Sequence, residues 1–287
     1  MVFMRIPNCI RNSLQILGWT TFFLWCGCTT DLPRPNITPQ DDPSNEWSKL
    51  VEEIVTEQGI DWSTLEANRQ VLENYIAWTG TVGPQTNRKN NTPFPKRGRT
   101  NQRFVHFVNA YNAWILYGYL EQGKPSTLDY MTDSNGFQPN TRIYIDGEYT
   151  TFAHIKFERL LADFQDPRIH IMLHELYTDS PPLQYWDYNT WHTHADKAMR
   201  EFIQNGAIRQ TESGWVFHPI FVHYAQDFVD WSLHDSVCDY LVDYTSSELK
   251  HWLMTQEQCT LQAFTIDKNV PSSNLAPAPN TTEENSP

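Results

Sequence analysis

The stretch QRFVHFVNAYNAWILYGYLEQG, residues 102–123, most constrains the fold, because it is apolar on almost every side of a helix. A helix of that kind is stable in water only when other parts of the protein surround it. Gly123 and Pro125 end the pattern, as expected at a helix C-terminus. The sequence therefore predicts a buried central helix, around which the other elements pack.

The flanking segments indicate an α+β single domain with several further helices and a small, mainly antiparallel sheet. Apolar residues at helical spacing predict helices near both ends of the domain, and alternating runs predict hairpins around Asp146-Gly147 and Ser213-Gly214. We expect the domain over residues 47–264. The predicted helices lie in residues 47–57, 65–78, 153–164, 188–206, 219–233, 235–244 and 246–258.

The first 28 residues resemble an export signal. Arg5 and Arg11 precede the apolar run LQILGWTTFFLWCGC, which has the length of a signal-peptide core and is too short to span a bilayer. The run ends at Gly27-Cys28, which indicates a lipobox with Cys28 as the lipidated residue. Plain cleavage with secretion and an uncleaved anchor are the alternatives. We expect an exported protein of the cell envelope, lipid-anchored and facing the periplasm.

Polar segments flank the predicted domain. Residues 29–46 are rich in Pro, Asp and Asn, which predicts a flexible tether that would hold the domain off a membrane. Residues 265–287 have too few apolar side chains to order themselves, which predicts a disordered tail.

The charge limits the choice of partner. Lys and Arg total 21 against 34 Asp and Glu, a formal net charge of -13. Nucleic acid needs a concentrated positive surface, so we expect no nucleic-acid partner, and contact with a membrane only through the N-terminal lipid. The expected partner is an unidentified envelope ligand or protein.

Two of the five cysteines lie in the predicted domain, Cys238 and Cys259. In an oxidising compartment such a pair is often bridged, so we expect a disulfide, with two free buried thiols as the alternative.

Polar residues of the central helix are candidates for a binding cleft. Asn109 and Asn112 are three residues apart and share one helix face, whereas Tyr111 lies on another. Buried amides must be hydrogen-bonded, so the two asparagines either tie the helix to a neighbouring segment or line a pocket.

The block DPRIHIMLHELYTDSPPL, residues 166–183, carries the other candidates. Ile169, Ile171 and Leu173 alternate, which predicts a strand with Arg168, His170 and His174 on its other face. Arg168 is expected either to pair with a carboxylate or to bind an anion.

Neither a metal nor a serine nucleophile is indicated. Ten histidines are present, but none of their spacings matches the zinc protease pattern, and Ser180 is not in a Gly-x-Ser-x-Gly turn. We expect no metal and no cofactor.

Three segments in order resemble the DUF547 family of unknown function: FVNAYNAWILYGYL, YIDGEYTTFAHIKFERLL and DPRIHIMLHELYTDSPPL. FHPIFVHYAQDF is a weaker fourth. The resemblance covers residues 46–231 and implies an Ile-Glu-His or Ile-Glu-Asn turn, followed by Asn-Cys-Gly-Ser and a second cysteine ahead of Pro-Pro-Leu. Such a cysteine with a histidine would suit thiol chemistry.

This chain departs from that pattern. His174 and Glu175 replace Asn-Cys, Ser180 replaces the second cysteine, and Lys156 with Phe157 replace Glu-His. Because the block has no cysteine, thiol catalysis is excluded there.

Two functions remain, and the sequence leaves open whether the chain is an enzyme. In the first, the domain binds or scaffolds at the cell envelope through a cleft formed by Asn109, Tyr111, Asn112, Arg168, His170 and Ser180. In the second, it is a hydrolase or transferase in which Glu175 with His174 or His154 acts as general acid and base.

Overall fold

The computed structural model describes residues 29–38, 41–83, 100–125, 137–256 and 258–270. At its centre lies helix α5, Asn101–Glu121, in which every residue from Phe104 to Leu120 is buried. The Thr100 hydroxyl caps the helix by accepting a hydrogen bond from the Arg103 amide. The predicted central helix is confirmed. Among the described residues, no helix is both long and apolar enough to cross a bilayer.

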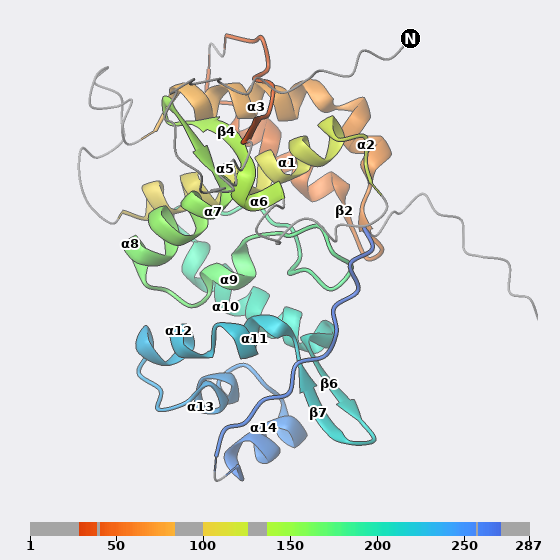
Figure 1. Ribbon diagram of the computed structural model, residues 1–287, viewed down its shortest axis with the longest axis vertical. Coiled ribbons are helices and arrows are strands. Elements are labelled where there is room, and N and C mark those ends of the chain that lie inside the picture. The colour runs from red at the N-terminus through yellow and green to blue at the C-terminus, as the bar shows by residue number, and fades with distance from the viewer. Residues whose placement is uncertain (1–28, 39–40, 84–99, 126–136, 257, 271–287) are drawn as a thin grey trace, which may run out of the picture.

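Three helices cover one side of α5 near the upper end of the molecule in Figure 1. Helix α3 packs on α5, α1 packs on α3, and stacking of the Trp47 and Tyr75 rings joins α1 to α3 with their centres 5.5 Å apart. The elements here are α1 (Ser44–Ile54), β2 (Val55–Thr56), β3 (Gly59–Ile60), α2 (Trp62–Ala67) and α3 (Arg69–Thr81).

The hairpin expected at Asp146-Gly147 is present. Strands β4 (Thr141–Ile145) and β5 (Glu148–Thr151) pair antiparallel. Both turn residues have positive φ, 51° for Asp146 and 83° for Gly147, as in the tight turns that match the twist of two strands. A short helix, α6 (Phe137–Asn140), precedes the hairpin.

The flexible tether expected over residues 29–46 is wrong at both ends of that segment, which are ordered. Strand β1 (Thr30–Asp31) pairs parallel with β4, and α1 already begins at Ser44. Leu32 is only 6% exposed, and Asp31 forms an ion pair with Arg142 at 2.6 Å. The Pro and Asp content predicted solvation, but a few apolar and charged contacts order this segment.

A continuous helical segment follows β5, as predicted. It consists of α7 (Phe152–His154), the π-helical turn η1 (Ile155–Leu161) and α8 (Ala162–Phe164), and it ends where Gln165 adopts a left-handed conformation, φ 52°. Lys156 lies on η1 and is buried, at 5% exposure.

The strand expected at residues 169–173 is wrong, because Ile169–Met172 form a short helix, α9. The Asp166 carboxylate accepts the Arg168 amide at 3.0 Å and starts this turn. His170 and Met172 are buried together with the two isoleucines, so the segment has no solvated face. The alternation of apolar residues therefore does not distinguish a strand from a helical turn here.

The remaining helices and a second predicted hairpin form the lower end of the molecule in Figure 1. The Cys238–Cys259 disulfide, with Cα atoms 5.7 Å apart, joins α13 to the segment after α14. These elements are α10 (Trp191–Phe202), η2 (Ile203–Ala207), β6 (Ile208–Thr211), β7 (Gly214–Phe217), α11 (Pro219–His223), α12 (Ala225–Asp230), α13 (Val237–Val242) and α14 (Ser247–Met254).

The C-terminal tail expected from residue 265 also needs correction. Ala263 bridges to Phe217 of β7, the Asn269 carbonyl accepts a hydrogen bond from Thr178, and Val270 is 9% exposed. Residues 271–287 lie outside the described residues.

The α+β class is confirmed. The strands form three small sheets instead of the single one expected: β1-β4-β5, β2-β3 and β6-β7. Among the strand pairs of the described residues, β1 with β4 is parallel and the other three are antiparallel.

Candidate functional site

Two asparagines connect α5 to the segments that follow α9. The Asn112 amide donates to the Met172 carbonyl at 3.0 Å and accepts from the His174 amide at 2.9 Å. Asn109 makes the same pair of hydrogen bonds with the backbone of Trp186, at 2.8 and 2.9 Å. Each side chain therefore pairs with the backbone as a neighbouring strand would. Both are structural ties, and Asn109 also borders a cavity.

The carboxylate predicted as a catalytic candidate, Glu175, belongs to a buried ion pair. Lys156 Nζ of η1 donates to Glu175 Oε1 at 2.9 Å, and the two side chains are only 7% and 16% exposed. The ammonium also lies 5.2 Å from the centre of the Tyr224 ring. These are the two positions at which the chain departs from the family's acid and cysteine.

The pair keeps both groups charged. Burial alone would lower the pKa of Lys156, but the charges and hydrogen bonds of Glu175 and Tyr224 together more than offset it and raise that pKa. Burial alone would raise the pKa of Glu175, but the Lys156 charge and hydrogen bond bring it below its usual value. An acid or base serving near neutral pH needs a pKa in that region, so neither group is poised for proton transfer.

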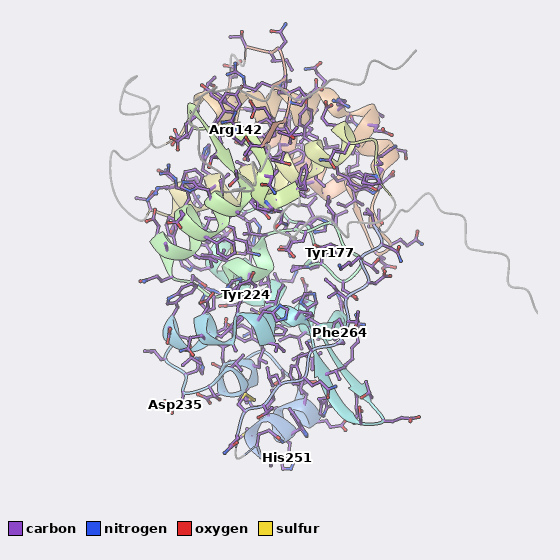
Figure 2. All side chains as sticks on the ribbon, in the orientation of Figure 1. Arg142, Tyr177, Tyr224, Asp235, His251 and Phe264 are labelled. Atoms are coloured by element: carbon purple, nitrogen blue, oxygen red, sulfur yellow. A yellow bond between two sulfur atoms is a disulfide. The ribbon has the colours of Figure 1, made fainter. Side chains whose placement is uncertain are left out.

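His170 lies beside this pair and is part of the packing. Its Nε2 donates to Asp227 Oδ2 at 2.8 Å, and its ring stacks on Tyr224 with the centres 4.0 Å apart. Burial lowers the pKa of His170, an effect that Asp227 partly offsets. Figure 2 shows Tyr224 in the middle of the molecule, between the upper and lower elements.

Tyr111 completes the group. It is fully buried, its ring meets Phe152 edge-on at 5.3 Å, and its hydroxyl has no hydrogen-bond partner among the described residues. Burial raises its pKa, and the negative charge of Glu175 raises it further, which indicates that the carboxylate is near. We call Tyr111, Lys156, His170, Glu175 and Tyr224 the polar centre.

The two histidines proposed as partners of Glu175 do not serve it. His174 Nδ1 donates to the Pro181 carbonyl at 2.8 Å, and burial lowers its pKa. His154 is exposed on α7. Within the described part of the chain, the hydrogen-bond partner of Glu175 is Lys156, and no imidazole donates to it.

Arg168 and Ser180 have structural partners as well. The Arg168 guanidinium donates to Asp166 at 2.7 Å and to Asp196 at 2.8 Å, so the carboxylate pairing expected for it is present and uses the donors that an anion would need. Ser180 Oγ accepts from the Tyr177 amide at 2.8 Å and closes a turn.

The six residues expected at one cleft are thus distributed over the interior. Asn109 borders a cavity of about 440 Å³ between α1, α3 and α5, whereas Ser180 borders a different one of about 770 Å³ beside β6. Tyr111, Asn112, Arg168 and His170 border neither cavity.

Sequence reasoning missed the partners that close the polar centre. Lys156 was noted only as a departure from the family pattern, and Tyr224 and Asp227 were not considered. The signal was the weak fourth segment, FHPIFVHYAQDF, which supplies both of the latter residues. Its position after the other three segments in the chain could have indicated that it folds back onto them.

Other expectations concern metals and lipid. Over the described ranges, no group of His, Cys, Asp or Glu side chains is arranged to hold a metal ion. The expected lipidation residue, Cys28, lies outside the described residues.

The comparisons with known proteins agree with the sequence resemblance. Residues 95–203 match the family model described as "Protein of unknown function, DUF547". The match covers α5, the β4-β5 hairpin, η1, α9 and most of the predicted site. No curated protein and no solved structure matches the chain.

Proposed function

Since this chain belongs to the DUF547 family, whose function is unknown, we propose its function from the site: it is an exported domain of the cell envelope that binds or scaffolds without catalysing a reaction. The proposed location is the periplasmic side of a membrane, held there by a lipid on Cys28.

The Lys156–Glu175 ion pair carries this proposal. The two residues occupy the positions that correspond to the acid and the thiol of the family pattern, and their charges satisfy each other at 2.9 Å in a nearly buried setting. A thiol site needs a nucleophile with a base beside it. Here both positions are occupied by charged groups that neutralise each other inside the protein.

General acid and base chemistry is less well supported. It would require Glu175 to exchange a proton near neutral pH, whereas Lys156 holds its pKa below the usual value. Glu175 also borders neither of the two cavities described above, so a substrate in either would not meet it.

The experiment compares single and double substitutions in a host strain that lacks the native gene. Glu175→Leu alone would leave the Lys156 charge buried without a partner, so a loss of function could come from unfolding. The double variant K156M/E175L removes both charges and keeps similar volumes. We expect it to be folded, exported and as active as the wild type in restoring the phenotype of the deletion strain.

The opposite outcome would reverse the proposal. A double variant that is folded and exported in normal amounts, yet fails to restore the phenotype, would assign chemistry to this pair. The matched control is K197M/E201L, which removes a solvent-exposed pair on α10.

The location is tested by the mass of the mature chain. Extraction of the native protein from membranes, followed by intact-mass measurement, should yield a chain that starts at a diacylated Cys28. A soluble chain that starts elsewhere, or one that retains Arg5, would contradict the proposed anchor.

A further inference from the structure

The cavity of about 440 Å³ between α1, α3, α5 and residues 185–188, here called the aromatic cavity, has a wall of stacked rings. Trp78 lies between Tyr75, with ring centres 5.8 Å apart and nearly parallel, and His106, which it meets edge-on at 5.8 Å. Tyr185 and Tyr188 add further rings to the lining. A cavity of this size accommodates a small organic molecule.

Two carboxylates border the same cavity, Asp42 before α1 and Asp187 before α10. In each, Oδ1 accepts a backbone amide, from Ser44 and from Asn189 respectively, both at 2.9 Å. In the hydrogen bonds of the described residues, Oδ2 of either aspartate has no protein donor. The carboxylates therefore have acceptor capacity left for a ligand.

The two carboxylates act on the same ring. Burial raises the pKa of Tyr185, and the charges of Asp42 and Asp187 raise it further, against a hydrogen bond from Ser44. Burial also raises the pKa of Tyr75, and Tyr185 and Asp42 raise it further. Both negative charges are thus close enough to this wall to act on one ligand.

Nothing in the described lining neutralises these charges. The residues bordering the aromatic cavity include no lysine and no arginine, and burial lowers the pKa of His106 to about 4, so its ring is neutral at pH 7. The helix N-termini beside the two aspartates offset only part of their charge. The cavity therefore combines a negative potential with several aromatic side chains in its lining.

We propose that the aromatic cavity binds a small organic cation, of the alkylated ammonium class, beside the aromatic side chains of Trp78 and Tyr185 and the carboxylates of Asp42 and Asp187. Such a cation is attracted by aromatic faces, and its alkyl groups gain from leaving water. The carboxylates distinguish it from a neutral molecule of the same shape.

This inference rests on the proposal that the domain binds a ligand, and it names the ligand class. The aromatic cavity is separate from the polar centre, since neither Lys156 nor Glu175 borders it. The two proposals can therefore fail independently.

The test uses the purified full-length chain and two probes of the same shape. Choline carries the charge, and 3,3-dimethyl-1-butanol is its neutral carbon analogue. Titration calorimetry, supported by tryptophan fluorescence, should show choline binding at least about tenfold tighter than the alcohol. Choline binding should weaken as salt is added, because Asp42 is exposed.

Variants then locate the site. D42N/D187N keeps the oxygens that accept the backbone amides and removes both charges, and it should weaken choline binding by about tenfold or more. Asp235→Asn is the matched control, because Asp235 is exposed at the opposite end of the molecule, as Figure 2 shows. It should leave binding unchanged.

Three results would overturn the inference: equal affinity for choline and the alcohol, no choline binding up to about 10 mM, or wild-type affinity in D42N/D187N. Binding of N-acetylglucosamine without binding of choline would assign the aromatic cavity to neutral sugars instead. K156M/E175L should bind choline as the wild type does, so a negative titration leaves the result for the polar centre unaffected.

Discussion

The polar centre and the aromatic cavity both border α5, but they use charge in opposite ways. In the polar centre, Lys156 and Glu175 neutralise each other inside the protein, at 2.9 Å. At the aromatic cavity, Asp42 and Asp187 each keep an oxygen without a donor among the described residues, and the described lining has no lysine or arginine. In the first arrangement the charges satisfy each other within the protein, whereas the second leaves interaction energy for a ligand.

This difference bears on how a lost activity is recognised. Lys156 and Glu175 stand at positions that correspond to catalytic ones, but because they pair with each other they are a poor guide to where a ligand binds. Polar groups that lack a partner among the described residues are the better guide. The comparison favours the aromatic cavity over the block at residues 166–183 as a binding site.

Breaking the ion pair should have the largest effect on stability. Removing either partner leaves the other charge buried, so Lys156→Met and Glu175→Leu should each lower the free energy of unfolding by about 3–5 kcal/mol. The double variant should return to within about 1 kcal/mol of the wild type or exceed it. Urea unfolding measures all three. Additive losses in the double variant would mean that the two charges are not coupled.

Replacing either asparagine of α5 should lower the free energy of unfolding by an intermediate amount, and the loss should differ between the two. Asn112→Ala leaves the Met172 carbonyl and the His174 amide without partners in the interior, which should cost about 2–3 kcal/mol. Asn109→Ala should cost about 1 kcal/mol, because water in the aromatic cavity can reach the freed Trp186 backbone. Urea unfolding of the two variants tests this order, and equal losses would show that water does not enter.

The effect that is smallest near neutral pH should be a dependence of stability on pH, which grows only as the pH falls. Burial lowers the pKa of His106, at the aromatic cavity, and of His218, near Glu175, to about 4 in each case. In the unfolded chain these groups titrate near 6.5, so between pH 6.5 and 4 the unfolded state binds more protons and stability falls as the pH falls. Each histidine should contribute at most about 1.4 kcal/mol per pH unit.

Replacing either histidine should reduce the dependence of the free energy of unfolding on pH. His106→Phe keeps a ring against Trp78, and His218→Asn keeps an acceptor for the Ile220 amide. Urea unfolding at several values between pH 7 and pH 4 compares each variant with the wild type. An unchanged slope would mean that the histidine is already protonated in the folded state.

The fold was predictable where the signal is local. The central helix follows from an apolar run, the β4-β5 hairpin from Asp146-Gly147, and the disulfide was expected from the two cysteines left after the export segment. Helix α9 was not predictable, because alternation over five residues fits a buried helical turn as well as a strand.

The site was predictable only in part. Asn112 bonds to the block at residues 166–183, as expected for a structural tie, but the single cleft expected from these residues is not formed. Lys156 and Glu175 are 19 positions apart, and each alone resembles an ordinary surface charge. Their pairing depends on tertiary contact. The one indication was that both positions depart from the same family pattern with opposite charges.

Strand β1 has a consequence for how the domain would meet a bilayer. Thr30 is already paired with Thr141, and one residue separates it from Cys28 in the sequence. If Cys28 carries the proposed lipid, the backbone that joins it to the sheet spans at most about 7 Å. Under the proposed anchoring, so short a link would hold the β1-β4-β5 sheet close to the bilayer surface, and a partner of the domain would have to reach it there.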